Sequence, residues 1–380
     1  MHPFVRAARR QKTATVELIE RLAGCESPSG SPDAVNELVN LLVSETKDIA
    51  WAERSETKGF GDVLRLNFAL ASASSERKRI LALGHSDTVW PKGTLPSMPV
   101  KRSKGRLWGP GVLDMKSGLA FLVTAVRVLK ELDIAVPREL VLLVVPDEEV
   151  GSPESRSITE REARASDLVL VLEPGTGSTG KLKTARKGVG RYRVSVRGRA
   201  AHAGVDFENG ASAILEAARQ IERISALTDL KRGITVNPGV IRGGTRSNVV
   251  AAEAQIEVDL RAVTNKDANA LDRKLKGLRA VDKRCTLLVE GGLNRPPMER
   301  TRAMANLFGR AQAVADELGI SIEESATGGG SDGNFTAALG IPTLDGLGGV
   351  GEGAHAPNES ILLDRVVDRV AFLAGLIAKL

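Results

Sequence analysis

The stretch RELVLLVVPDEEVGS, residues 138–152, places a continuous apolar run directly before a pair of glutamates. A second run of this kind, DLVLVL at residues 167–172, leads into Glu173. Apolar runs without polar alternation are typical of strands buried on both faces, which occur where helices cover a parallel sheet. The two segments therefore predict an α/β fold with a mixed, mostly parallel sheet sandwiched by helices.

The segments around these two runs support the same fold. One more short strand is expected at residues 80–83, where an apolar run ends just before His85. Apolar residues recur at helical spacing in five other segments, residues 16–23, 32–46, 118–132, 301–318 and 363–380. Strands and helices thus alternate through the first half of the chain, and helices dominate its end.

The pattern changes near residue 185, where strands with alternating polar and apolar residues replace the continuous apolar runs. Such alternation indicates strands with one solvent-facing side. The order β-α-β-β-α-β is expected at residues 191–196, 210–227, 235–241, 254–260, 267–278 and 285–289. This order is typical of a ferredoxin-like α+β unit. We therefore expect an inserted domain at residues 186–292, between two parts of a metal-binding catalytic domain at residues 1–185 and 293–380.

Composition restricts the class of protein. The chain has 380 residues, of which 42% are apolar, enough for two domains. It has no run of about 18 apolar residues and no apolar segment in its basic start, so we expect a cytoplasmic protein without a membrane span or secretory signal. The net charge of +6 is scattered and only 3% of residues are aromatic, which argues against nucleic-acid binding and favours small anionic substrates. Cys25 and Cys285 are expected to be buried thiols.

Imidazoles and carboxylates are expected to meet at one edge of the sheet. The polar residues that follow the three predicted strands of the first half are His85, Asp87, Glu148, Glu149 and Glu173. The carboxyl ends of strands in an open α/β sheet form its functional edge. Mixed imidazole and carboxylate ligands suit zinc, cobalt or manganese better than calcium or magnesium. The pattern therefore predicts a transition-metal site.

Separate roles can be expected for these side chains. Asp87 lies two residues beyond His85, on the same side of an extended segment, so its carboxylate can orient the imidazole. Asp114 lies in a glycine-rich turn before a helix and could bridge two cations. Two free carboxylates at one site repel each other, so one of Glu148 and Glu149 is expected to bind metal and the other to move protons.

From about residue 16 to its end, the sequence resembles the di-zinc exopeptidase and deacylase family that includes glutamate carboxypeptidase, acetylornithine deacetylase, succinyl-diaminopimelate desuccinylase and aminoacylase. The glutamate carboxypeptidase branch is the most similar. The motifs that carry the resemblance are HSDTVWPKGTL (85–95), RLWGPGVLDMKSG (106–118), GRAAHAG (198–204), RSNVV (246–250), VDLRA (258–262) and GGGSDGNF (328–335).

The resemblance implies two Zn²⁺ ions per subunit, with Co²⁺ or Mn²⁺ as substitutes. It assigns His85 to one metal and His355 to the other, with Asp114 bridging both, Glu149 completing the first site and Glu173 the second. Glu148 would be the general base and Asp87 the residue that orients His85. The family also implies a cis peptide bond between Asp114 and Met115.

The resemblance further implies that the insert is a lid and dimerisation domain of a homodimer. His202 would reach the partner subunit's active site and stabilise the oxyanion. Asn248 and Arg261 would contact the carboxylate end of a peptide or N-acyl amino acid. The remaining substrate-binding positions would be Lys181 and Arg295, which match basic residues of the glutamate-specific branch, and Gly329 and Gly330, which allow close backbone approach.

Three other functions are compatible with parts of the sequence. An N-acyl amino acid deacylase would use the same metal site and differ only in its pocket. A metal-free binding protein would have lost Glu148 or the ligands, all of which are present. Nucleic-acid binding has only the net charge in its favour. The sequence therefore favours a metallohydrolase that cleaves an amide bond next to a free carboxylate.

Overall fold

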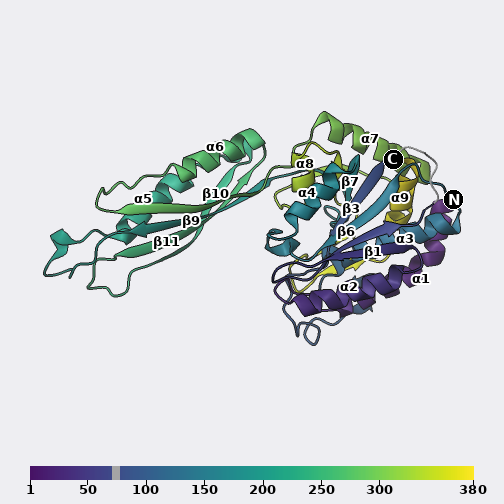
Figure 1. Ribbon diagram of the computed structural model, residues 1–380, viewed down its shortest axis with the longest axis horizontal. Coiled ribbons are helices and arrows are strands. Elements are labelled where there is room, and N and C mark those ends of the chain that lie inside the picture. Colours follow the sequence, from purple (N-terminus) through teal and green to yellow (C-terminus); the bar gives the residue numbers. More distant parts are fainter. Residues whose placement is uncertain (71–77) are drawn as a thin grey trace. The chain divides into compact units, whose positions relative to one another are not determined.

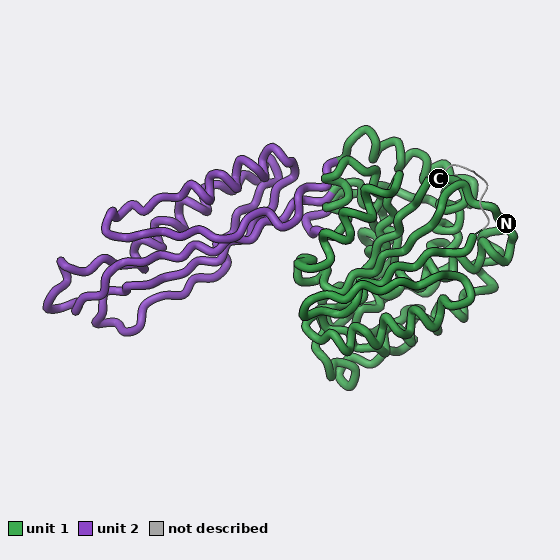
Figure 2. The backbone as a smooth tube through the Cα atoms, viewed as in Figure 1, with its two compact units in different colours: residues 1–185, 300–326, 331–380 green, residues 186–299, 327–330 purple. Residues whose placement is uncertain are grey.

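The computed structural model describes residues 1–70 and 78–380, which form two compact units. The larger unit comprises residues 1–185, 300–326 and 331–380, and the smaller comprises residues 186–299 and 327–330, coloured green and purple in Figure 2. Each unit is thus built from discontinuous stretches of chain. Residue 292, the expected end of the insert, lies inside a strand that continues to Arg295.

The larger unit is organised around a six-stranded sheet with the order β1-β2-β6-β3-β7-β14 (Figure 1). Its strands are β1 (Ala50–Ser55), β2 (Val63–Phe68), β3 (Arg79–His85), β6 (Glu139–Val145), β7 (Leu168–Val171) and β14 (Thr343–Leu344). Strands β6, β3, β7 and β14 are parallel, whereas β1 and β2 are antiparallel to their neighbours. The sheet is mixed and mostly parallel, as the apolar runs predicted.

Both faces of this sheet are buried. On β6, Leu142 and Val144 belong to one apolar cluster, and Leu143 and Val145 belong to another on the opposite face. The helices of the larger cluster are α1 (Pro3–Gly24), α2 (Pro32–Thr46), α3 (Ser117–Glu131), α7 (Arg302–Leu318) and α9 (Val366–Lys379). The other face is covered by α4 (Arg156–Arg164) and α8 (Gly333–Ala338). Each fully buried Leu or Val contributes about 1.5–3 kcal/mol, so these layers fix the sheet's register.

Two small sheets complete the larger unit. One has the order β15-β16-β5-β4, from Gly351–Glu352, Ser360–Leu362, Arg106–Trp108 and Lys101–Ser103. The other pairs β8 (Leu182–Arg186) with β13 (Glu324–Thr327). Because β16 pairs with β5, the loop before β16, which contains His355, lies beside the turn after β5, which contains Asp114. The first small sheet therefore unites two predicted ligands from distant parts of the sequence.

The smaller unit has the expected β-α-β-β-α-β order. Its elements are β9 (Gly188–Arg197), α5 (Ala213–Ser225), β10 (Thr235–Gly243), β11 (Glu253–Ala262), α6 (Asn265–Lys276) and β12 (Thr286–Arg295). The sheet is antiparallel with the order β10-β11-β9-β12. In β9 and β11, every second residue is buried against α5 and α6, for example Val194 and Ile256. The residues between them, such as Arg193 and Glu257, lie on the opposite face of the sheet and are at least partly exposed.

Local sequence signals explain where several helices begin. Ser212, Thr264 and Thr301 precede α5, α6 and α7, and each hydroxyl accepts a hydrogen bond from the backbone N–H three residues on. Such caps are each worth about 1 kcal/mol.

Both cysteines are free thiols; Cys285 is buried as expected, but Cys25 is only half-buried because it lies at the exposed end of α1. Over residues 1–70 and 78–380, no helix has the length and apolar character needed to cross a membrane.

Candidate metal centre

Three of the predicted ligands, His85, Glu149 and Glu173, lie at the carboxyl ends of three neighbouring strands of the larger unit. Strand β3 ends at His85, the single turn at Glu148–Val150 follows β6, and Glu173 lies two residues beyond β7. Because β3 runs parallel to both β6 and β7, these ends share one edge of the sheet. The edge predicted from the sequence therefore holds the predicted carboxylates.

Asp114 lies between the two imidazoles. Its Oδ1 is 3.2 Å from His85 Nε2, and its Oδ2 is 3.3 Å from His355 Nε2. The peptide bond between Asp114 and Met115 is cis, as the resemblance implied. One carboxylate that directs each oxygen towards a different imidazole has the arrangement needed to bridge two cations.

The closest contacts pair the remaining carboxylates differently from the expectation. Glu173 Oε1 is 3.6 Å from His85 Nε2, and Glu149 Oε2 is 3.2 Å from His355 Nε2. Ligand atoms of His85, Asp114 and Glu149 also lie within 4.8 Å of one another, so Glu149 is near both imidazoles. The expected grouping was Glu149 with His85 and Glu173 with His355, whereas the ion-pair contacts favour Glu173 with His85 and Glu149 with His355. Strands β6 and β7 both flank β3, so only the directions of the side chains decide the pairing.

Glu148 lies on the His85 side of the cluster. Its carboxylate, a nitrogen of His85 and the carboxylate of Glu173 have atoms within 4.8 Å of one another. Glu149, in contrast, has its Oε2 3.2 Å from His355 Nε2. This geometry distinguishes the two adjacent glutamates, which the residue pattern alone could not do.

Asp87 connects the imidazole on β3 to the turn that carries both glutamates. Its backbone carbonyl lies 2.9 Å from His85 Nδ1, and its carboxylate Oδ1 lies 3.4 Å from the same nitrogen. The carboxylate also accepts hydrogen bonds from the backbone N–H groups of Glu148, at 3.2 Å, and Glu149, at 3.1 Å. Since a carbonyl can only accept, Nδ1 is the donor and Nε2 is left free to bind a metal. The expectation was that the Asp87 carboxylate orients His85, whereas the shorter contact with Nδ1 is made by the Asp87 backbone carbonyl.

The protonation states of the side chains in the cluster depend strongly on one another. Burial alone would raise the pKa of Asp114, but the hydrogen bonds with His355 and His85 hold it well below its usual range. Burial would lower the pKa of His85, yet Asp114 and Asp87 raise it well above the ordinary value. Hydrogen bonds with Asp114 and Glu149 raise the pKa of His355 to about 10. When no cation is bound, protonated imidazoles therefore supply the positive charge that balances the carboxylates.

The donor set fits two transition-metal cations. Among the described residues, the buried Oε1 of Glu149 has no hydrogen-bond partner, as expected for an oxygen reserved for a metal. Two imidazoles and several carboxylates form the mixed nitrogen and oxygen set that zinc accepts. Binding of cations would let the imidazoles become neutral and would satisfy the negative charge of the cluster.

The other predicted site residues, apart from Lys181, lie in the smaller unit. His202 and Asn248 are exposed on adjoining segments, since the N–H of Ala203 donates to the Asn248 carbonyl at 3.0 Å. Arg261 forms a two-pronged ion pair with Asp259, at 2.8 and 2.9 Å, and its Nη1 reaches the Gly328 carbonyl at 3.4 Å. Strand pairing thus places Arg261 near the end of β11 beside the 327–330 loop, whereas His202 and Asn248 lie beyond the other end of the β9/β11 pair.

The remaining predicted substrate residues already have partners. Lys181, in the larger unit, forms an exposed ion pair with Glu323 at 2.5 Å. Arg295 is buried and donates to the Asn294 side chain at 3.1 Å. The carbonyls of Gly329 and Gly330 each accept from Arg186 Nη1 at 3.2 Å. Any substrate contact made by Lys181 or Arg295 has to compete with these interactions.

Two residues that support the cluster were not identified from the sequence. Ser29 Oγ donates to Asp87 at 2.6 Å, and the buried carboxylate of Glu359 accepts from the backbone N–H of Asp114 at 3.1 Å. Glu359 ends the EGAHAPNE motif, so its spacing from His355 was available as a signal. Ser29 lies in a Ser/Gly/Pro segment that resembles an ordinary turn, and nothing in that pattern indicated a contact with Asp87.

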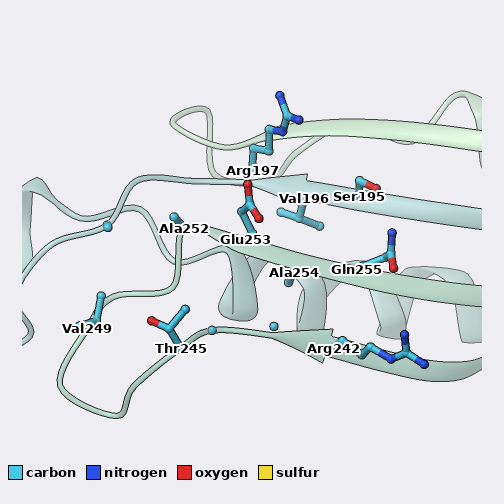
Figure 3. Close-up of a pocket in the computed structure, with 13 residues that line it drawn as sticks. Ser195, Val196, Arg197, Arg242, Thr245, Val249, Ala252, Glu253, Ala254 and Gln255 are labelled. Atoms are coloured by element: carbon cyan, nitrogen blue, oxygen red, sulfur yellow. The ribbon is translucent and has the colours of Figure 1, made fainter.

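A cavity of 540 Å³ lies in the smaller unit, on β9, β10 and β11 and the adjoining loops (Figure 3). Its walls include Ser195, Arg197, Arg242, Glu253 and Gln255. The metal-cluster side chains lie in the larger unit and do not line this cavity. It is a feature of the smaller unit's sheet and not the metal centre.

A partly buried carboxylate between two imidazoles, at the edge of a mostly parallel sheet, is the arrangement of a two-metal hydrolase. The chain belongs to peptidase family M20/M25/M40, which matches residues 81–379. It is therefore an enzyme of the metallopeptidase and amidohydrolase class, and the predicted family is confirmed.

Relatives of known activity fall into two groups. Carboxypeptidase G2 from Pseudomonas sp. (strain RS-16) is 28% identical over 97% of this chain and 89% of its own length. Succinyl-diaminopimelate desuccinylase from Verminephrobacter eiseniae is 29% identical over 75% of this chain and 74% of its own. Aminopeptidase PepT from Bacillus cereus has the same fold, with a TM-score of 0.80, 24% identity and coverage of 97% of this chain and 98% of its own. The relatives thus include both peptidases and deacylases.

Proposed function

We propose that this enzyme is a di-zinc carboxypeptidase that releases glutamate from the carboxyl end of an N-acyl or peptidyl substrate. The observation that carries the proposal is Asp114, whose two carboxylate oxygens face His85 and His355. Similarity to carboxypeptidase G2 across 97% of the chain supports the choice of substrate.

Five side chains would hold the cations. His85 and Glu173 would bind one, His355 and Glu149 the other, and Asp114 both; Co²⁺ or Mn²⁺ would replace Zn²⁺ in the same donor set. When bound, the cations would polarise the scissile carbonyl and lower the pKa of a water molecule between them.

Glu148 would act as the general base. It takes one proton from the attacking water as the water oxygen bonds to the amide carbon, and it returns a proton to the amine nitrogen as the carbon–nitrogen bond breaks. Asp87 accepts the N–H groups of Glu148 and Glu149 and so keeps the proton shuttle and the metal ligand apart. One water is consumed, and the products are a carboxylic acid and an amino acid.

The smaller unit, with Lys181 of the larger unit, would supply the contacts to the substrate. His202 of the partner subunit would donate a hydrogen bond to the developing oxyanion. Arg261 and Asn248 would bind the free carboxylate, for which the guanidinium fork is suited. Gly329 and Gly330 would let the backbone approach the substrate closely, and Lys181 and Arg295 would favour an acidic side chain such as glutamate.

A homodimer formed through the smaller unit would place His202 for this role. Strand β10 is at the edge of its sheet and presents Ile241, which is 51% exposed. Helix α5, which packs against β10, exposes Ile214 and Leu215 at 43% and 53%. An open edge strand beside apolar side chains is a surface that a second copy can cover. Light scattering of Ile241→Lys against wild type tests this, because a shift from dimer to monomer is expected.

Hydrolysis of an N-aroyl-L-glutamate, with and without a chelator, tests the proposed activity. Release of glutamate that stops on chelation and returns with Zn²⁺ is the expected result. The deacylase relatives make N-acetyl and N-succinyl amino acids the matched alternatives. If metal-loaded enzyme cleaves these and leaves the N-aroyl-glutamate intact, the enzyme is a deacylase and the carboxypeptidase proposal is wrong.

A further inference from the structure

Glu359 is a buried carboxylate with every acceptor position occupied. Its Oε2 accepts from the indole Nε1 of Trp90 at 2.8 Å and the backbone N–H of Gly111 at 2.9 Å. Its Oε1 accepts from the backbone N–H groups of Leu113 at 2.9 Å and Asp114 at 3.1 Å. Three of the four donors therefore belong to the short turn that ends at the bridging ligand.

The same residue ends the loop that contains the second imidazole. Glu359 lies four residues beyond His355, and its own N–H donates to the Ala356 carbonyl at 2.9 Å. The N–H of Ala356 in turn donates to the Gly353 carbonyl at 2.8 Å. Strand β16 begins at the next residue, Ser360, and pairs with β5. The loop is thus a chain of short turns whose last side chain is fixed to the Asp114 turn.

The four donors require a carboxylate. An ionised carboxylate offers about four lone-pair sites, whereas an amide of the same shape offers two and turns an NH₂ group towards its neighbours. Burial raises the pKa of Glu359, and the backbone N–H groups of Asp114, Gly111 and Leu113 oppose this by favouring the anion. A glutamine at this position would place donors against donors and leave buried N–H groups without acceptors.

We propose that Glu359 is a positioning residue that fixes Asp114 relative to His355, and thereby sets the affinity and geometry of the metal pair. This inference rests on the proposed two-metal function. Glu359 has no direct contact with the substrate or the reacting atoms in this role; it acts through the backbone of the Asp114 turn. Comparable residues behind metal ligands change metal affinity by about 10- to 100-fold.

The test measures metal binding rather than turnover. Zn²⁺ dissociation constants come from competition with a chromophoric chelator, and the visible absorption of the Co²⁺-loaded protein reports ligand geometry. For Glu359→Gln we expect a dissociation constant raised about 10- to 100-fold and a changed Co²⁺ spectrum. Glu352→Gln is the matched control, because Glu352 lies on β15 of the same small sheet and its side chain forms an exposed ion pair with Arg106 at 3.3 Å. It should bind metal like the wild type.

The possible results distinguish a positioning role of Glu359 from a purely structural one. If Glu359→Gln lowers the melting temperature but leaves the Zn²⁺ affinity and Co²⁺ spectrum unchanged, Glu359 is merely structural and the proposal is overturned. If Glu359→Gln does not fold, Trp90→Phe decides, since it removes one donor and keeps the carboxylate; weaker Zn²⁺ binding supports the proposal and unchanged binding refutes it. A wild type that binds no metal would instead refute the proposed function.

Discussion

Replacement of Asp87 by asparagine is the change whose effect the structure defines best. Asp87 is 1% exposed, and its carboxylate accepts from Ser29 Oγ and from the backbone N–H groups of Glu148 and Glu149. Asparagine has the same shape but only one acceptor oxygen. That oxygen can keep the Glu148 N–H, and the NH₂ group can donate to Ser29 Oγ. The N–H of Glu149 then faces a donor.

The expected magnitude follows from that unsatisfied group. A buried N–H without an acceptor costs about 1–3 kcal/mol, so the free energy of unfolding should fall by that amount. The turn carrying Glu148 and Glu149 can relieve the clash only by moving, which displaces the general base and a metal ligand together. We therefore expect kcat/KM to fall about 10- to 100-fold at saturating Zn²⁺, the range found for residues that orient metal ligands.

The assay combines initial rates at saturating Zn²⁺ with urea unfolding of the same samples. Ser29→Ala is the control, because it removes one contact to Asp87 and leaves both glutamate N–H groups with their acceptor. It should change kcat/KM by less than about threefold, as expected for loss of a hydrogen bond worth about 0.5 kcal/mol. Wild-type kcat/KM in Asp87→Asn would refute the assigned role of this carboxylate.

Four further predictions can be checked with the same preparation. Glu148→Ala should lower kcat by about 10²- to 10⁴-fold while metal content, measured by atomic absorption, stays close to the wild type; a wild-type rate would disprove the general-base assignment. Arg261→Lys should raise KM roughly tenfold with little change in kcat, because a charge-assisted hydrogen bond worth about 1.5 kcal/mol is lost; an unchanged KM would place the substrate carboxylate elsewhere. Removing metal should lower the free energy of unfolding by about 2.7 kcal/mol for each of the two cations, relative to protein with free Zn²⁺ at 100 times the dissociation constant of each site, and equal urea midpoints would contradict binding at this centre. In chelated protein, hydrogen bonds with Asp114 and Glu149 raise the pKa of His355 from 6.5 to about 10, so its contribution to stability is complete below pH 6.5 and lost by about pH 10; the difference in urea stability between wild type and His355→Gln should shrink over that range, and a constant difference would rule the effect out.

The sequence alone predicted those features of the fold that depend on the pattern of apolar and polar residues within a short segment. Helix α2 begins and ends at the predicted residues, 32 and 46, because its apolar spacing is bounded by Pro32 at its start. The apolar runs at 138–145 and 167–172 became the central strands β6 and β7, since continuous apolar character is needed only when both faces are covered. The β-α-β-β-α-β order of the smaller unit followed from alternation in the same way. Hydrophobic periodicity acts within a few residues, so it can be read without the fold.

Which carboxylate contacts which imidazole depends on the tertiary structure. The residue types and their positions after strands predicted a mixed imidazole and carboxylate site, but Glu149 turned towards His355 and Glu173 towards His85, the reverse of the expected pairs. The hydrogen bonds between Glu359 and the Asp114 turn likewise depend on the pairing of β16 with β5, which joins segments about 250 residues apart. The sequence determines which metal-binding side chains follow each strand and so lie at one edge of the sheet, because the position of a strand's end depends on nearby residues. The direction in which each side chain points depends on turns and hydrogen bonds contributed by distant parts of the chain.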